Sequence, residues 1–312
     1  MIGRQGALCG NMNYSVGKAY FTEHAVVVKA DENNDTRFLY YMLDTMNLGQ
    51  YSDQSAQPGL AVNKLVKLEN QFPMKEEQQR IGWYFSNIDH LITLHQRKCE
   101  ETKSLKKYML QKMFPENGNC VPKIRFSGFA DAWEQRKLGG ILKERTERAH
   151  GDEELLSVTI GNGVIRQIDS DKRNIASEDK SNYKVVKKGD IPYNSMRMWQ
   201  GAVGNSEYDG IVSPAYTVLT PTSDANGKFF MELFKKESTL QIFQRWSQGL
   251  TSDTWNLKYP VLSSIQFDIP SVEEQTEIAR YFSILDSLIT LHQHKCDELQ
   301  KLKKFMLQNM FV

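Results

Sequence analysis

Residues 193–201 carry side chains suited to hydrogen-bonding the flat edges of nucleobases. They include Asn194, Ser195, Arg197 and Gln200. Arginine and the two amides can each make paired hydrogen bonds to a base edge, and a hydroxyl can add one more. The segment therefore predicts contact with nucleic acid. The alternative is an ordinary solvated loop between strands.

A second polar segment, residues 248–256, offers Thr251, Ser252 and Asn256 beside Trp255. Hydroxyl and amide groups of this kind suit base edges or phosphates. Trp255 fits equally well in a hydrophobic core. We predict nucleic-acid contact here too, with packing of the tryptophan as the alternative.

Nearby lysines suggest a source of phosphate contacts. Lys187 and Lys188 end the basic run 184–188, and residues 172–174 are Lys-Arg-Asn. Phosphate attraction acts through clustered cations, and the total charge of +1, from 39 basic and 38 acidic residues, gives no signal of its own. The alternative is that these charges only keep the surface soluble.

Two pairs of residues, His95/Cys99 and His292/Cys296, are each spaced four apart and so share a helix face. Together they could form a Cys₂His₂ zinc site. They also fall on an apolar seam, where one polar layer can set the register of paired helices. We favour the polar layer and expect no bound metal.

An internal repeat provides the elements that position these groups. Residues 273–311 repeat residues 76–114 at a constant offset of 197, with 25 of 39 positions identical and no gap. Seam residues spaced alternately by four and three are typical of a coiled coil, and each helix would be roughly 60 Å long. The seams are Ile81, Phe85, Ile88, Ile92, His95 and Cys99, and Ile278, Phe282, Leu285, Ile289, His292 and Cys296.

The repeat extends weakly upstream of each helix. Gln5-Gly6-Ala7 matches Gln200-Gly201-Ala202, residues 25–28 match 215–218, and Gly59-Leu60 matches Gly249-Leu250. Residues 1–72 therefore resemble only the second half of the domain in 120–270. We expect a strand and a short helix in the first segment. In the second we expect a helix over about 133–147, then strands with one helical piece, residues 229–246.

This ordered set of features resembles the specificity subunit of type I restriction–modification systems. The resemblance rests on the duplicated P-x-x-EEQ helix start, the LITLHQ…MLQ…MF helix body and the segment VPKIRFSGFADAWEQRKLG at residues 121–139. It implies a member truncated at its N-terminus. Motifs for phosphate loops, dinucleotide binding, zinc proteases and serine hydrolases are absent from the sequence, so we expect no catalysis by this chain alone.

The resemblance also implies an α+β fold, with mixed α/β target-recognition domains joined by two long antiparallel coiled-coil helices. Its parts would be a partial recognition domain (1–72), helix 1 (73–114), a complete recognition domain (115–270) and helix 2 (271–312). The implied partners are double-stranded DNA, methyltransferase subunits and restriction subunits. S-adenosylmethionine, ATP and magnesium would be used by those subunits, and no cofactor would be bound by this chain. A homodimer, or a complementing half-subunit encoded separately, would restore the missing half-domain.

No signal peptide and no apolar run long enough to cross a bilayer is evident in the sequence, so the expected location is cytoplasmic. The cysteines, without a CxxC pair, are expected to be reduced thiols. Three alternatives stay open at this point. They are a coiled-coil scaffold that does not bind DNA, a silent or recombining specificity cassette, and an enzyme with an unrecognised active site.

Overall fold

The computed structural model describes residues 1–52, 58–116, 118–151, 153–170 and 179–311. The chain divides into unit 1, Met1–Glu101 with Ile289–Val312, and unit 2, Thr102–Leu288. Each unit therefore contains part of both long helices, α3 (Lys75–Lys112) and α8 (Val272–Met310). Among the described residues, no helix is long and apolar enough to cross a membrane.

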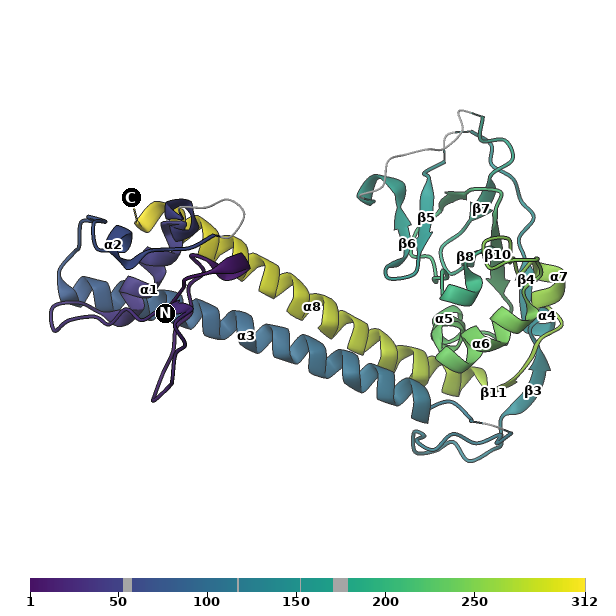
Figure 1. Cartoon of the computed structure of the whole chain (residues 1–312). Coiled ribbons are helices and arrows are strands. Elements are labelled where there is room, and N and C mark those ends of the chain that lie inside the picture. Colours follow the sequence, from purple (N-terminus) through teal and green to yellow (C-terminus); the bar gives the residue numbers. More distant parts are fainter. Residues whose placement is uncertain (53–57, 117, 152, 171–178, 312) are drawn as a thin grey trace. The chain divides into compact units, whose positions relative to one another are not determined.

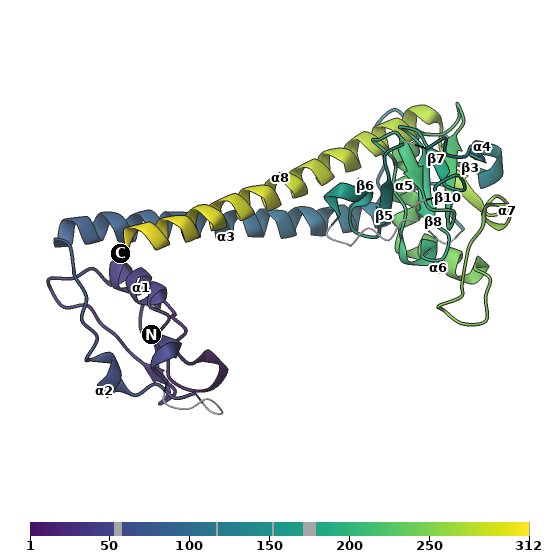
Figure 2. The same cartoon turned by 90° about the horizontal axis from the view of Figure 1, so that it is seen from above.

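Within each unit the segments of α3 and α8 lie side by side and antiparallel (Figure 1, Figure 2). In unit 1, Lys303 Nζ of α8 lies 2.6 Å from Asp89 Oδ1 of α3. In unit 2, Lys106 Nζ of α3 lies 2.7 Å from Asp286 Oδ2 of α8. Since 106 and 286 become 303 and 89 by the repeat offset, the same contact occurs twice with the helices exchanged. The predicted antiparallel helix pair is confirmed.

Unit 2 contains a three-stranded antiparallel sheet in the order β4–β10–β8, and pairs β11–β3, β5–β6 and β7–β9. The strands are β3 (Glu134–Lys137), β4 (Leu142–Glu144), β5 (Leu156–Thr159), β6 (Gly163–Arg166), β7 (Lys184–Val186), β8 (Ile191–Asn194), β9 (Gly210–Val212), β10 (Tyr216–Pro221) and β11 (Gln266–Ile269). Its helices besides α3 and α8 are α4 (Leu138–Ile141), η3 (Gln167–Asp169), η4 (Met198–Gln200), α5 (Gly227–Lys235), α6 (Glu237–Trp246) and α7 (Tyr259–Leu262).

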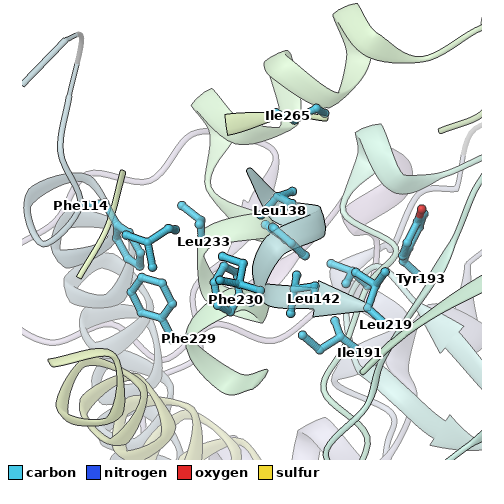
Figure 3. Close-up of a cluster of buried hydrophobic side chains, with 14 of the residues drawn as sticks. Phe114, Leu138, Leu142, Ile191, Tyr193, Leu219, Phe229, Phe230, Leu233 and Ile265 are labelled. Carbon is cyan, nitrogen blue, oxygen red and sulfur yellow. The ribbon is translucent and has the colours of Figure 1, made fainter. Parts of the chain in front are cut away.

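The core of unit 2 lies where this sheet meets α4 and α5. Leu142, Leu219 and Phe230 are fully buried there, and Figure 3 shows them grouped with neighbouring apolar side chains. The same cluster extends to Phe114 at the end of the first long helix and to Phe282 on the second. Burial of these large side chains stabilises the packing of the sheet and short helices of unit 2 against its part of the helix pair.

Unit 1 repeats part of this arrangement. It contains β1 (Ile2–Gly3), η1 (Gly6–Leu8), β2 (Ala25–Val26), α1 (Thr36–Thr45), η2 (Leu48–Tyr51) and α2 (Val62–Leu65). Ile2 pairs with Val26, and Tyr193 pairs with Thr217, so both strands of unit 1 match strands of unit 2 at an offset of 191. The N-caps Asp35 and Asn226 keep this offset. The match of residues 25–28 to 215–218 was therefore wrong by one residue.

Each long helix fixes the start of its neighbouring short helix through the glutamine of its EEQ motif. Gln78 Oε1 accepts from the backbone N–H of Asp35 at 2.9 Å, and Gln275 Oε1 accepts from that of Asn226 at 2.8 Å. Both glutamines are buried, and each donates from Nε2 to the carbonyl of the proline that precedes its helix. The glutamine of the EEQ motif thus connects the first turn of each long helix to the N-terminus of the neighbouring short helix, α1 or α5.

One secondary-structure prediction was wrong, and another was confirmed with a break in the helix. The expected helix over 133–147 is instead β3, the one-turn α4 and β4. Gly139 and Gly140 weaken helix propensity there, and both strands find ladder partners, β11 and β10. The helical piece over 229–246 is two helices, α5 and α6, because Lys236 takes an extended conformation with ψ of 133°.

Candidate nucleic-acid interface

The two polar segments predicted from sequence lie together in unit 2. The rings of Trp199 and Trp255 pack edge to face, with centroids 5.3 Å apart. The backbone N–H of Leu257 donates to Ser195 O at 2.8 Å, and the hydroxyl of Tyr193 donates to Leu257 O at 2.9 Å. We call residues 194–201 the first loop and 248–256 the second loop.

The first loop is a tight turn built on a buried anchor. Met198 is fully buried, whereas the neighbouring Arg197 is exposed. Asn194 Oδ1 accepts from the N–H of Met196 at 3.0 Å, which closes the turn at the end of β8. Gly201 ends η4 with φ of 86°, a left-handed conformation that favours glycine. The backbone therefore holds Arg197 outward.

The second loop is closed at its base and polar at its tip. Gln248 and Asn256 pair through two backbone hydrogen bonds of 2.9 and 2.8 Å. Thr254 Oγ1 donates to Thr251 O at 2.9 Å, a local turn that leaves Ser252 exposed. The half-buried Asn256 and the half-buried Gln200 flank the tryptophan contact. Trp255 thus packs against the other loop rather than only in the core.

Two exposed arginines lie in or next to these loops. Arg197 and Arg245 are both exposed, and neither makes an ion pair or side-chain hydrogen bond with the part of the chain that the structure describes. Arg245 lies in the last turn of α6, which packs against η4. Sequence reasoning missed Arg245. Its position in the helix turn just before the second loop was the signal that could have identified it.

Three of the predicted contact residues are placed differently. Ser195 is buried, and its hydroxyl lies 2.9 Å from Thr217 Oγ1, so this side chain supports the sheet instead of facing outward. Lys187 and Lys188 are exposed in the turn before β8, at the opposite end of that strand from the first loop. The basic segment 172–174 lies outside the described residues.

Unit 1 presents a smaller set of polar groups at the equivalent place. The N–H of Leu60 donates to Arg4 O at 2.8 Å, as Leu257 does to Ser195, so Arg4 corresponds in position to Ser195 and not to Arg197. Gln5 Oε1 lies 2.6 Å from His24 Nδ1. Unit 1 therefore has an arginine and a glutamine just after β1, but they do not occupy the positions of Arg197 and Gln200 after β8.

The His/Cys pairs lie on the helix seam of unit 1. His95 Nδ1 and His292 Nδ1 are 3.0 Å apart, and Cys99 and Cys296 are buried beside them. Within the described residues, no group of three or more metal-ligating side chains comes together. Cys99 Sγ instead approaches the Ile289 carbonyl at 3.9 Å. This arrangement supports the prediction of a polar layer that sets register.

Comparison with known proteins gives a family. The model of the type I restriction modification DNA specificity domain matches residues 2–104 and 130–301. The chain belongs to this family.

Named relatives in this specificity-subunit family agree. The chain is 47% identical over 91 residues to the type I restriction enzyme EcoprrI specificity subunit of Escherichia coli, which covers 29% of this chain and 23% of that protein. It is 22% identical over 308 residues to the MjaVIII specificity subunit of Methanocaldococcus jannaschii, covering 90% of this chain and 71% of that protein.

Solved specificity subunits have the same fold. The S subunit from M. genitalium matches with a TM-score of 0.59 at 15% identity, over 90% of this chain and 73% of that one. The HsdS subunit from Thermoanaerobacter tengcongensis matches with a TM-score of 0.50 at 16% identity, over 90% and 70%. The predicted mixed helix-and-strand fold is therefore confirmed.

Proposed function

We propose that this chain is a sequence-specific DNA-recognition and assembly subunit of a type I restriction–modification complex, and that unit 2 reads double-stranded DNA through its first and second loops. The observation that carries the proposal is the Trp199–Trp255 contact, which joins two polar loops into one surface. Two unpaired arginines on this surface suit phosphates and guanine edges, and nearby amides suit adenine.

We choose the residues proposed to contact DNA by the exposure of their side chains. Arg197, Arg245, Thr251 and Ser252 face outward, while Asn194, Gln200 and Asn256 are half-buried at the base of the loops. Because major-groove reading needs side chains that project, we assign base contacts first to Arg197 and the second loop. Lys187 and Lys188 would meet phosphate only on a DNA segment that also reaches the other end of β8. Ser195 is left out because its hydroxyl is buried.

Assembly would use the long helices. Three positions are apolar and exposed in both copies of the repeat: Leu91 and Leu288 at 40% and 39%, Leu105 and Leu302 at 44% and 41%, and Tyr108 and Phe305 at 51% and 61%. Each unit holds one member of each pair. Exposed apolar side chains kept in duplicate favour docking of two copies of one protein. Methyltransferase subunits are the expected occupants, with restriction subunits joining that core.

Catalysis would belong to the partners. The chain lacks the usual motifs for binding S-adenosylmethionine-type or nucleotide cofactors, so S-adenosylmethionine, ATP and magnesium would be used by methyltransferase and restriction subunits. Such a complex would act in the cytoplasm.

The first test separates DNA contact from assembly. Methylation mapping in cells that carry this chain and its modification partner gives the target motif, and DNA affinity is then measured on the purified complex over a range of salt concentrations. We expect Arg197→Ala and Arg245→Ala each to weaken binding by about tenfold, equivalent to about 1.4 kcal/mol, and to reduce the salt dependence. The matched control is Arg280→Ala, an exposed arginine of α8 that pairs with Glu277.

The second arm uses the double variant Leu105→Asp/Leu302→Asp. It should lose co-purification of the partner, whereas Arg197→Ala should keep it. Salt-independent DNA binding that neither arginine variant changes would instead favour a scaffold that does not read DNA. Methylation by the chain without any partner would revive the alternative of an enzyme.

A further inference from the structure

The tip of the second loop carries an apolar side chain that no other part of the described chain covers. Leu250 is 101% exposed, which means that its whole side chain faces water. A single exposed leucine is common on protein surfaces, so exposure alone points to no contact. What distinguishes Leu250 is its place in a loop that we propose to contact DNA, five residues after the exposed Arg245.

Comparison of the two units shows that Leu250 is not a displaced core residue. The sequence match of Gly59-Leu60 to Gly249-Leu250 predicts that the two leucines are equivalent. In the structure Leu60 instead takes the place of Leu257. The N–H of each donates to the carbonyl of the residue just after β1 or β8, and both leucines are buried. That match was therefore wrong, and the core of unit 2 does not use Leu250.

The backbone of the second loop holds Leu250 in this position. Gly249 has φ of 146°, and a Cβ there would lie 2.6 Å from Thr254 O, so the chain passes too close for any other residue. On the other side, the N–H of Trp255 donates to Thr251 O at 3.1 Å, and the N–H of Thr251 donates to Thr254 Oγ1 at 3.1 Å. Leu250 therefore stands between two fixed points of the backbone, which leaves little loop entropy to be lost on binding.

Two further exposed apolar side chains lie in or next to the two loops. Met196 of the first loop is 42% exposed, and Trp246 at the end of α6 is 47% exposed. Each is next in sequence to an exposed arginine, Arg197 or Arg245. Apolar groups and cations are thus mixed on this surface, which suits a ligand that presents both anions and methyl groups. The major groove of DNA presents phosphates, guanine edges and thymine methyl groups.

Duplex DNA offers one apolar group to a side chain in the major groove, the C5-methyl of thymine. Apolar side chains distinguish thymine by contact with this methyl group, which cytosine and deoxyuridine lack. The other use of an exposed leucine is as a wedge between bases, but such wedges enter from the minor groove. The arginines and amides of the two loops instead match the donor and acceptor pattern of the major groove.

We propose that Leu250 contacts the C5-methyl group of a thymine in the recognised DNA sequence and so makes that base part of the specificity of unit 2. The inference rests on the proposed function, because it requires the second loop to lie in the major groove. Thr251 and Ser252 follow Leu250 and are exposed, so their hydroxyls would meet the same or neighbouring base edges. A hydroxyl can bond to any base, whereas the methyl group marks thymine.

The test compares thymine with deoxyuridine, which lacks only the methyl group. Each thymine of the mapped motif and its flanks is replaced singly, and affinity is measured on the purified complex by fluorescence anisotropy. At one thymine we expect the wild type to bind about fourfold more weakly after replacement, the value of one buried methyl group. In Leu250→Ala the same replacement should leave the affinity unchanged, because no side chain reaches the methyl group.

The matched control is Ile168→Ala, since Ile168 is 84% exposed in η3 of unit 2 and lies outside both loops. This variant should behave as the wild type on every duplex. Leu250 has no packing contact to lose, so Leu250→Ala should keep the urea midpoint of the wild type and its co-purifying partner. Leu250→Met, which keeps an apolar side chain of similar length, should restore part of the thymine effect.

Three results would overturn the inference. The first is a thymine effect that is equal in the wild type and Leu250→Ala, or absent at every thymine. The second is loss of the partner from Leu250→Asp, which would make this leucine a protein contact. The third is Leu250-dependent brightening of 2-aminopurine in the motif, which would show a wedge between bases. Weaker DNA binding by Arg197→Ala without any Leu250-dependent thymine would leave the proposed function standing while this assignment fails.

Discussion

At the scale of single residues, the repeat has kept one lysine–aspartate contact twice and changed what surrounds it. Lys303 and Asp89 meet beside Tyr41, whose hydroxyl donates to Asp89 at 2.7 Å. Lys106 and Asp286 meet beside Glu232, which is 1% exposed and lies 3.0 Å from the lysine. Burial raises the pKa of Glu232, and the Lys106 ammonium opposes that rise. Lys106 therefore has to neutralise a buried carboxylate that its counterpart does not face.

Replacing each lysine by methionine should show this difference. Lys106→Met removes the cation that is hydrogen-bonded to buried Glu232 and leaves only the attraction of Lys235, and we expect a loss of about 3 kcal/mol in the free energy of unfolding of unit 2. Lys303→Met leaves Asp89, which is partly exposed and still accepts a hydrogen bond from the Tyr41 hydroxyl, so about 1 kcal/mol should be lost from unit 1. Urea unfolding followed by hydrogen exchange in each unit measures both. A larger loss for Lys303→Met would contradict this assignment.

The sequence predicted two candidate contact loops, which lie together in unit 2, but not the direction of their side chains. Asn194, Ser195, Arg197 and Gln200 have similar polar character in the sequence. The fold separates them, because Ser195 points to Thr217 in the sheet while Arg197 follows the turn outward. Spacing along a loop has no period that predicts exposure, whereas the period of a helix does. Whether Arg245, Lys187 and Lys188 lie near the two loops likewise depends on the tertiary fold and could not be read from the sequence.

At the scale of elements, the long helices were the best predicted parts because their seams repeat over many turns. The seam positions Ile81, Phe85 and Ile88 are buried as expected. The helix predicted over residues 133–147 was wrong because this segment is short and has no long repeating pattern. Its conformation is set by pairing with two strands distant in the sequence, β10 and β11. The polar layer of His95 with His292 is where we expect pairing of the helices to depend on protonation.

Stability of the helix pair should depend on pH through this layer. Burial lowers the pKa of His95, and His292, Lys98 and Lys295 lower it further. The unfolded chain, with an ordinary histidine pKa of about 6.5, then binds protons more readily than the folded one. Stability is full above that pH and falls as the pH drops through it.

Urea midpoints measured between pH 8 and 5.5 should decrease in the wild type, and less in His95→Leu, which removes this proton site. The same decrease in both proteins would exclude His95 as the source. Exchange protection of residues 85–99 should follow the midpoints, because the layer lies among them.

At the scale of the whole molecule, each unit depends on both long helices. Unit 1 takes the beginning of α3 and the end of α8, and Phe311 packs on Phe38 and Phe85 with centroids 5.4 and 5.8 Å away. Unit 2 takes the other two ends, with Phe114 against Phe229 and Phe282. A phenylalanine at the end of each helix thus closes the core of the unit it reaches.

Ending the chain at Leu302 should therefore affect the units unequally. It removes Lys303 and Phe311 from unit 1, so α1 should lose amide protection, while α5 and α6 of unit 2 should keep theirs. Hydrogen exchange with mass spectrometry measures both in one sample. The variant Phe311→Ala should give a smaller loss at α1. Equal loss in the two units would show that they unfold together.

The division of the helices also bears on the order in which a ribosome releases the chain. Domains generally fold during synthesis from the N-terminal side. Here residues 102–288 form one continuous stretch, whereas unit 1 must wait for residues 289–312 to be translated after it. Until then its seam of Ile81, Phe85, Ile88 and Ile92 has no partner helix. Unit 1 is thus completed after unit 2 although residues 1–101 are translated before it, and in that interval its apolar seam is open to chaperones, proteases and mispairing.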